Sequence, residues 1–222
     1  SHAAGLMVKP LQEAKIGFGA ALAEAPTKQA EVDAWIVKLF DELQPKAVIA
    51  TEKGGVAFNG LVHNATGQPM TNPEEIGMVE ITGLLAEANK RGIYTIGIGD
   101  HGNEAGFGSI REAVERIMPK GDQLCAASKA DLVMPVMMSN WGCYGIEAAL
   151  AFLLKRPDLV HSPAQEERIV RACLDAGGLE AMYCTTDFFV DGLEGETSMA
   201  VVQFLGNIVR KMTEAPDTGV AH

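Results

Sequence analysis

The densest group of residues that could do chemistry is the segment GIGDHGNEAGFGS, residues 97–109. It brings Asp100, Asn103 and Glu104 close together between glycines that let the backbone turn tightly. Carboxylates at this spacing repel one another unless a cation or a proton neutralises them. Because oxygen ligands suit Mg²⁺ or Mn²⁺, the segment predicts a divalent metal ion held by Asp100 and Glu104. The alternative is that one carboxyl group stays protonated and acts as an acid.

Gly97, Gly99 and Gly102 also match the G-x-G-x-x-G pattern of dinucleotide-binding loops. We reject that interpretation because Asp100 and Glu104 would face the pyrophosphate, where backbone N–H groups and positive charge are needed. The structural alternative is a glycine-rich loop with helix-capping acids.

The rest of the chain alternates between strand and helix patterns, which predicts an α/β protein with a layered α/β/α fold and a mostly parallel sheet. The expected strands cover residues 47–51, 93–99, 123–126, 131–137 and 181–186. The expected helices cover residues 28–44, 73–92, 108–118, 141–155, 163–176 and 198–212, with Asn72 as the cap of the second and Ser162 as the cap of the fifth.

In an open parallel sheet, ligands bind beyond the carboxyl ends of the strands. The polar and aromatic residues that follow the strands are therefore candidates for one site: Glu52, Lys53, Asp100, Asn103, Glu104, Asn140, Trp141, Thr185 and Asp191. Simpler interpretations stay open, with Asn140 as a helix cap, Trp141 as core, Glu52–Lys53 as a solvated pair and Asp191–Gly192 as an ordinary turn. His101 lies in the dense loop and either contacts a substrate or faces solvent. His63 and His101 lack the spacing of a histidine zinc site.

Composition narrows the function classes. The 222 residues carry 18 basic and 29 acidic side chains, a net charge of −11, which argues against binding to nucleic acids and to anionic membranes. The four cysteines contain no C-x-x-C pair and are expected as free thiols in a cytoplasmic protein. We expect one α/β domain over residues 28–213. Residues 1–27 form an N-terminal segment that is partly an expression remnant, and residues 214–222 form a tail. Homo-oligomerisation is compatible with the sequence.

Four segments in the same order resemble the D-glutamate cyclase family. They are TEKGG (51–55), GIGDHGNEAGFG (97–108), SNWGCYG (139–145) and VDG (190–192). Lys53 stands where the family usually has arginine, and His101 where it has glycine. The resemblance implies an α/β domain and a lyase that converts D-glutamate to 5-oxo-D-proline and water. It also implies Glu52, Asp100, Asn103, Glu104, Asn140 and Asp191 as site residues.

As a hypothesis, a bound Mn²⁺ or Mg²⁺ on Asp100 and Glu104 neutralises the substrate carboxylate that the amine attacks. Glu52, Asp100, Glu104 and Asp191 are the catalytic candidates, one of which carries protons. The substrate contacts are expected from Lys53, Asn59, His101, Asn103, Asn140, Trp141 and Thr185. Two alternatives remain at this point. The first is that the same site catalyses the reverse reaction and hydrolyses a lactam or other cyclic amide. The second is a module that binds a small carboxylate or lactam without turnover and needs no metal.

Overall fold

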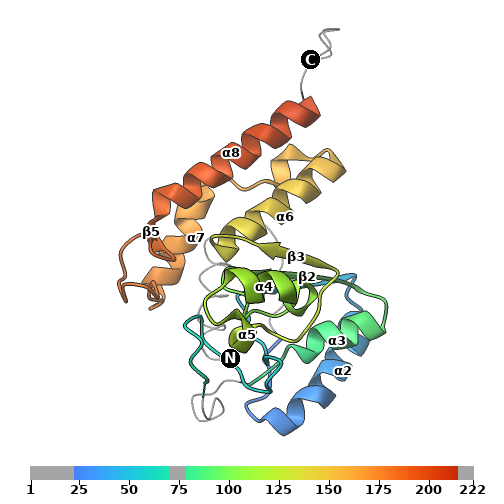
Figure 1. The fold of residues 1–222 in the computed structure, drawn as a ribbon. Coiled ribbons are helices and arrows are strands. Elements are labelled where there is room, and N and C mark those ends of the chain that lie inside the picture. The colour runs from blue at the N-terminus through green and yellow to red at the C-terminus, as the bar shows by residue number, and fades with distance from the viewer. Residues whose placement is uncertain (1–22, 71–78, 215–222) are drawn as a thin grey trace. The chain divides into compact units, whose positions relative to one another are not determined.

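The computed structural model describes residues 23–70 and 79–214 (Figure 1). The chain divides into two compact units, with residues 23–142 in the first and residues from 143 onward in the second. The single domain expected over residues 28–213 spans both units. Each unit is described by itself.

A parallel three-stranded sheet forms the centre of the first unit, in the order β1-β2-β3 (Figure 1). Its strands are β1 (Ala47–Thr51), β2 (Tyr94–Gly99) and β3 (Leu132–Pro135). Because all three run parallel, their carboxyl ends lie at one edge of the sheet. Pro135 is the last residue of an outer strand of the described sheet, a place where proline is tolerated. The α/β class and the parallel sheet are therefore confirmed.

Short helices flank this sheet. They are η1 (Gln29–Glu31), α2 (Val32–Leu43), α3 (Gly83–Lys90), η3 (Gly108–Ile110), α4 (Arg111–Ile117) and α5 (Gly121–Leu124). Helix α2 buries Val32, Ile36 and Phe40, which are spaced to share one helix face, and Val48 of β1 packs against the same cluster. The helix ends at Leu43 and is followed by Gln44, whose left-handed conformation leads into Pro45.

Two expectations for the first unit have different outcomes. The short strand expected over residues 123–126 is wrong, because helix α5 occupies Gly121–Leu124 and Ala126 makes only an isolated bridge with Ala57. The start of the helix expected over residues 73–92 lies outside the described residues, and so do Asn72, Glu74 and Glu75. Within the described residues the expected helix is too long, because residues 79–82 are not helical and α3 begins at Gly83 with Thr82 as its cap.

The second unit holds most of α6 (Ser139–Leu154), then η4 (Pro157–Leu159), α7 (Pro163–Asp175), β4 (Phe189–Val190), β5 (Leu193–Glu194) and α8 (Gly195–Glu214). Ala148 and Ala151 of α6 form a buried cluster with Val209 of α8. The predicted cap of α7 is confirmed, because the Ser162 side chain and Gln165 form a reciprocal capping box.

The strand expected over residues 181–186 is wrong. The buried carboxylate of Glu180 accepts hydrogen bonds from the backbone N–H groups of Met182, Tyr183 and Gly192. These bonds fold the apolar run into a turn, and only Glu180 and Thr185 pair across it. All four cysteines are free, as expected. Within residues 23–70 and 79–214, the helices are too short or too polar to cross a membrane.

Candidate functional site

The carboxyl ends of the three strands bring polar side chains together, as the strand-end rule predicts. Glu52 follows β1, Asp100 follows β2 and Ser139 begins the helix after β3. The Ser139 hydroxyl donates a hydrogen bond to Glu52 Oε1. Glu52 is held in the left-handed region at φ 52°, a conformation that non-glycine residues seldom adopt and that is often found at functional sites.

The glycines of the loop after β2 are required by close approach. A Cβ atom on Gly99 would lie 2.5 Å from Cδ of Glu104, and one on Gly97 would lie 2.5 Å from the carbonyl oxygen of Ala105. Gly102 has a φ of 92°, and a Cβ atom on it would lie 2.5 Å from Cγ1 of Val114. The interpretation that these glycines allow a tight turn around the acids is confirmed.

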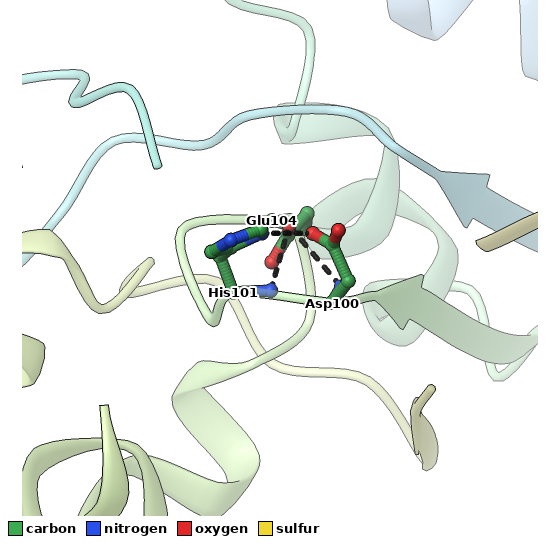
Figure 2. Close-up of side chains that lie close together, drawn as sticks. All are labelled: Asp100, His101 and Glu104. Carbon is green, nitrogen blue, oxygen red and sulfur yellow. Dashed lines mark hydrogen bonds and ion pairs between the residues drawn. The ribbon is translucent and has the colours of Figure 1, made fainter. Parts of the chain in front are cut away.

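Glu104 is the centre of this loop and is only 4% exposed (Figure 2). Its Oε2 atom accepts a hydrogen bond from the N–H of Gly102 at 2.7 Å. Its Oε1 atom accepts bonds from the N–H groups of His101 at 3.2 Å and Asp100 at 3.3 Å. Backbone N–H groups at such a turn would bind phosphate in a dinucleotide site. Here the chain's own carboxylate fills that position, which gives a physical reason against the dinucleotide interpretation.

Several ionisable groups in this loop lie close together. Burial raises the pKa of Glu104, and the hydrogen bond to Asp100 raises it further, against the opposing effect of the backbone N–H donors. His101 Nδ1 lies 2.5 Å from Asp100 Oδ1 (Figure 2). Burial alone would lower the pKa of His101, but Asp100 and the nearby charges of Glu104 and Glu52 raise it overall. The cluster therefore favours a bound positive charge.

Asp100, His101 and Glu104 also have the arrangement of a metal site. One ligand atom from each lies within 4.8 Å of the others. Two carboxylate oxygens and one imidazole nitrogen fit Mn²⁺ better than Mg²⁺, since Mg²⁺ prefers ligand sets made of oxygen. The backbone bonds to Glu104 would orient that ligand. His101 was expected as a substrate contact, and the geometry adds it to the two predicted metal ligands.

Three predicted substrate contacts are engaged in the loops around the cluster. Lys53 Nζ donates to the carbonyl of Val79 at 3.2 Å, and burial lowers the pKa of Lys53 despite the opposing charge of Glu80. The Asn103 amide donates to the backbone carbonyl of His63 at 3.0 Å. The Asn59 amide N–H group lies 3.4 Å from the imidazole of His63 and 3.4 Å from the carbonyl of Gln123. Their contacts with a substrate stay predictions.

The remaining predicted residues lie on α6 and in the second unit. Helix α6 begins at Ser139, so Asn140 is inside its first turn and does not cap a helix that starts at residue 141. Asn140 is exposed and Trp141 is half-buried. Asp191 and Gly192, with φ of 48° and 81°, form the two-residue turn between β4 and β5.

Thr185 also belongs to the second unit. Its hydroxyl donates to Asp187 Oδ2 at 2.8 Å and accepts from the Asp187 N–H at 3.1 Å. The catalytic role of Asp191 and the substrate contact of Thr185 remain predictions.

His63 lies beside this loop, where no sequence pattern places it. Its spacing from His101 argues only against a histidine zinc site, yet it is 4% exposed, its ring contacts Asn59 and its backbone carbonyl accepts a hydrogen bond from Asn103. The available signal was a single histidine within a segment rich in glycine and asparagine.

A parallel α/β fold with an acid–imidazole cluster at the strand ends, built around the buried Glu104, fits a small-molecule enzyme. The chain belongs to the D-glutamate cyclase-like C-terminal family, which it matches over residues 4–206. It is also 35% identical over 107 residues to the human protein described as D-glutamate cyclase, mitochondrial. That match covers 48% of this chain but only 17% of the human protein, so the chain corresponds to a small part of that relative. The resemblance to the family is confirmed, and the comparisons give no support to a lactam hydrolase.

Proposed function

We propose that this chain is a D-glutamate cyclase-like lyase that converts D-glutamate to 5-oxo-D-proline and water. The observation that carries the proposal is the Asp100–His101–Glu104 cluster, built around the buried Glu104, on a glycine loop in a chain of this family. An acidic cluster repels a substrate with two carboxylates unless a cation lies between the cluster and the substrate. The proposal therefore includes a divalent ion.

The reaction requires a proton carrier as well as charge neutralisation. The α-amino nitrogen forms a bond to the γ-carboxyl carbon, and one carbon–oxygen bond of that carboxyl group breaks. The ammonium group gives up two protons, and both end on the oxygen that leaves as water. Since one group can accept and return each proton in turn, a single carboxylate near the reacting atoms is sufficient.

Asp100, His101 and Glu104 are the residues that would hold Mn²⁺ or Mg²⁺. The bound ion would neutralise the γ-carboxylate and polarise its carbonyl. Gly102, His101 and Asp100 keep the Glu104 carboxylate in place through their backbone N–H groups. This orientation reduces the rearrangement needed when the substrate binds.

Glu52 is the proposed proton carrier. Its side chain is exposed, accepts a hydrogen bond from Ser139, and its charge contributes to the raised pKa of His101 in the cluster. The strained backbone at Glu52 fixes the direction of the side chain as it leaves β1. Glu52 can therefore take a proton from the amine and pass it to the departing oxygen without leaving its hydrogen bond to Ser139.

The direct test is to incubate the purified protein with D-glutamate and Mn²⁺ and to measure 5-oxo-D-proline by chiral chromatography. L-Glutamate serves as the matched control for the substrate. We expect product from D-glutamate above the uncatalysed background. Absence of product with both Mn²⁺ and Mg²⁺ would contradict the proposal.

Metal binding is tested separately by electron paramagnetic resonance of free Mn²⁺ during titration with protein. Asp100→Asn is expected to weaken Mn²⁺ binding at least about tenfold, because the amide lacks the charge of the proposed carboxylate ligand, and changes to the groups around a bound metal have effects of that order. Glu112→Gln, on an exposed position of α4, is the control and should bind as the unmodified protein does. Equal Mn²⁺ binding by all three proteins would remove the metal from the proposal.

A further inference from the structure

A cleft of about 680 Å³ opens on the surface of the first unit beside helix α4 (Figure 1). Its lining comes from three separate parts of the chain, which are Phe58, the segment 108–113 together with Arg116, and Lys129. Pockets that hold small organic molecules have volumes of about 300–1,000 Å³, so the cleft is large enough for one. The residues of the metal cluster do not belong to its lining.

The ionisable side chains that line the cleft are mainly basic, although the whole chain carries a net charge of −11. Arg111, Arg116 and Lys129 belong to the lining, against one acid, Glu112. Arg111 Nε donates to Glu115 at 2.5 Å. In the described part of the chain, the other two basic side chains are in no ion pair. Their charges are therefore uncompensated and attract an anion.

The backbone on which the cleft is built is fixed before any ligand binds. The N–H of Gly108 donates to the carbonyl of Ser128 at 3.0 Å. The Ser109 hydroxyl donates to the carbonyl of Ala130 at 2.8 Å and accepts from the N–H of the same residue at 3.1 Å. These bonds hold the chain on both sides of Lys129 against the start of α4. Such preorganisation reduces the ordering that ligand binding would otherwise require.

Phe58 gives the cleft an accessible aromatic ring. It is 45% exposed, and the guanidinium group of Arg111 lies 4.0 Å from the centroid of its ring. The bond from Nε to Glu115 orients this guanidinium group, so the ring and the cation are positioned together. Nucleobases stack on aromatic side chains and on arginine guanidinium groups, whatever the base, because every base has a flat face. The cleft therefore has a surface for a flat ring beside its positive charges.

We propose that this cleft binds a small phosphate ester that carries a flat ring, of the nucleoside monophosphate class. The phosphate group binds to Arg116 and Lys129, and the ring stacks on Phe58 and Arg111. A phosphate monoester carries about −1.5 to −2 charges at pH 7, which matches two cations better than the single charge of a carboxylate does. The planar guanidinium group can also donate two parallel hydrogen bonds to phosphate.

The ligand-side test is isothermal titration calorimetry with adenosine monophosphate (AMP), ribose 5-phosphate and adenosine, without added metal. Ribose 5-phosphate lacks the flat ring, and adenosine lacks the phosphate. We expect AMP to bind and each fragment to bind at least about tenfold more weakly, because each loses either the stacking or the charged contacts. Absence of AMP binding, or equal affinity for AMP and either fragment, would overturn the inference.

The protein-side test uses variants of exposed side chains, which leave the buried core unchanged. Phe58→Leu removes the ring and keeps an apolar side chain, so it should weaken AMP binding about tenfold and leave ribose 5-phosphate binding unchanged. Lys129→Gln should weaken the binding of both. Lys46→Gln removes an exposed positive charge outside the lining and is the matched control. Unchanged AMP binding in Phe58→Leu, or equal losses in the two lysine variants, would overturn the inference.

The cleft and the proposed lyase site are tested apart. Asp100→Asn alters the metal cluster and should bind AMP as the unmodified protein does, whereas a loss of AMP binding in this variant would place the ligand at the cluster and overturn the inference. Conversion of D-glutamate without AMP binding would support the lyase and contradict the cleft. Selective AMP binding without conversion of D-glutamate would support the cleft and contradict the lyase.

Discussion

Because of His161, the second unit is predicted to lose stability at alkaline pH. Its Nδ1 atom lies 2.5 Å from Glu147 Oε2 on α6, and its Nε2 atom lies 3.0 Å from Glu166 Oε2 on α7. The ring stands edge-on to Tyr144, whose hydroxyl donates to Glu166. The His161 side chain is 13% exposed and that of Glu166 is 3% exposed, so solvent screens the two ion pairs only weakly.

Burial lowers the pKa of His161, but its bonds to Glu147 and Glu166 outweigh that effect and raise the pKa from 6.5 to about 9. At about 1.36 kcal/mol per pKa unit, this rise corresponds to roughly 3 kcal/mol of stability. Because the folded-state pKa is the higher one, the stabilisation is fully present below about pH 6.5. It is lost as the pH rises through about 9.

The perturbation is His161→Gln, compared with the unmodified protein by urea unfolding at about pH 6 and about pH 10. The unmodified protein should lose roughly 3 kcal/mol more than the variant between the two pH values. Groups that titrate elsewhere affect both proteins equally and cancel in this difference. Parallel pH profiles for the two proteins would refute the assigned role of the Glu147–His161–Glu166 group.

Three further predictions concern the loop, the second unit and the metal. Gly99→Ala should abolish measurable cyclisation, because the added Cβ would lie 2.5 Å from Glu104 Cδ, and a chromatographic assay showing normal turnover would contradict this. Ser162→Ala should destabilise α7 by about 1 kcal/mol through loss of its capping box, which urea unfolding would reveal, whereas an unchanged midpoint would count against it. Chelation with EDTA should stop product formation and added Mn²⁺ should restore it, so full activity after exhaustive chelation would exclude the metal.

The part of the site that lies in one short segment could be predicted from sequence. Asp100 and Glu104 are four residues apart in a glycine-rich turn, so their proximity follows from local geometry. The strand-end rule also predicts Glu52 as a site residue, because neighbouring parallel strands have their carboxyl ends at the same edge of the sheet. The α/β class followed from the alternation of strand and helix patterns in the same way.

Contacts between distant residues were not predictable from a single sequence. Asn103 meets the carbonyl of His63 across 40 positions, and no spacing rule connects them. The three N–H bonds to Glu104 depend on the side chain folding back over its own turn. The strand wrongly expected over residues 181–186 has a similar cause. The buried carboxylate of Glu180 accepts hydrogen bonds from the backbone there and holds it in a turn, although the apolar pattern is typical of a strand.

In the proposed function, the Glu104 cluster performs the cyclisation of D-glutamate. The most direct test is the rate of 5-oxo-D-proline formation by Glu104→Gln and by the control Glu112→Gln, each assayed with D-glutamate and Mn²⁺. Both variants remove one carboxylate and keep the side-chain size, but only Glu104 lies in the cluster. We expect Glu104→Gln to lose at least about a hundredfold in rate, within the range of a general acid–base or metal-binding group, while Glu112→Gln keeps the full rate. Equal rates in the two variants would contradict it.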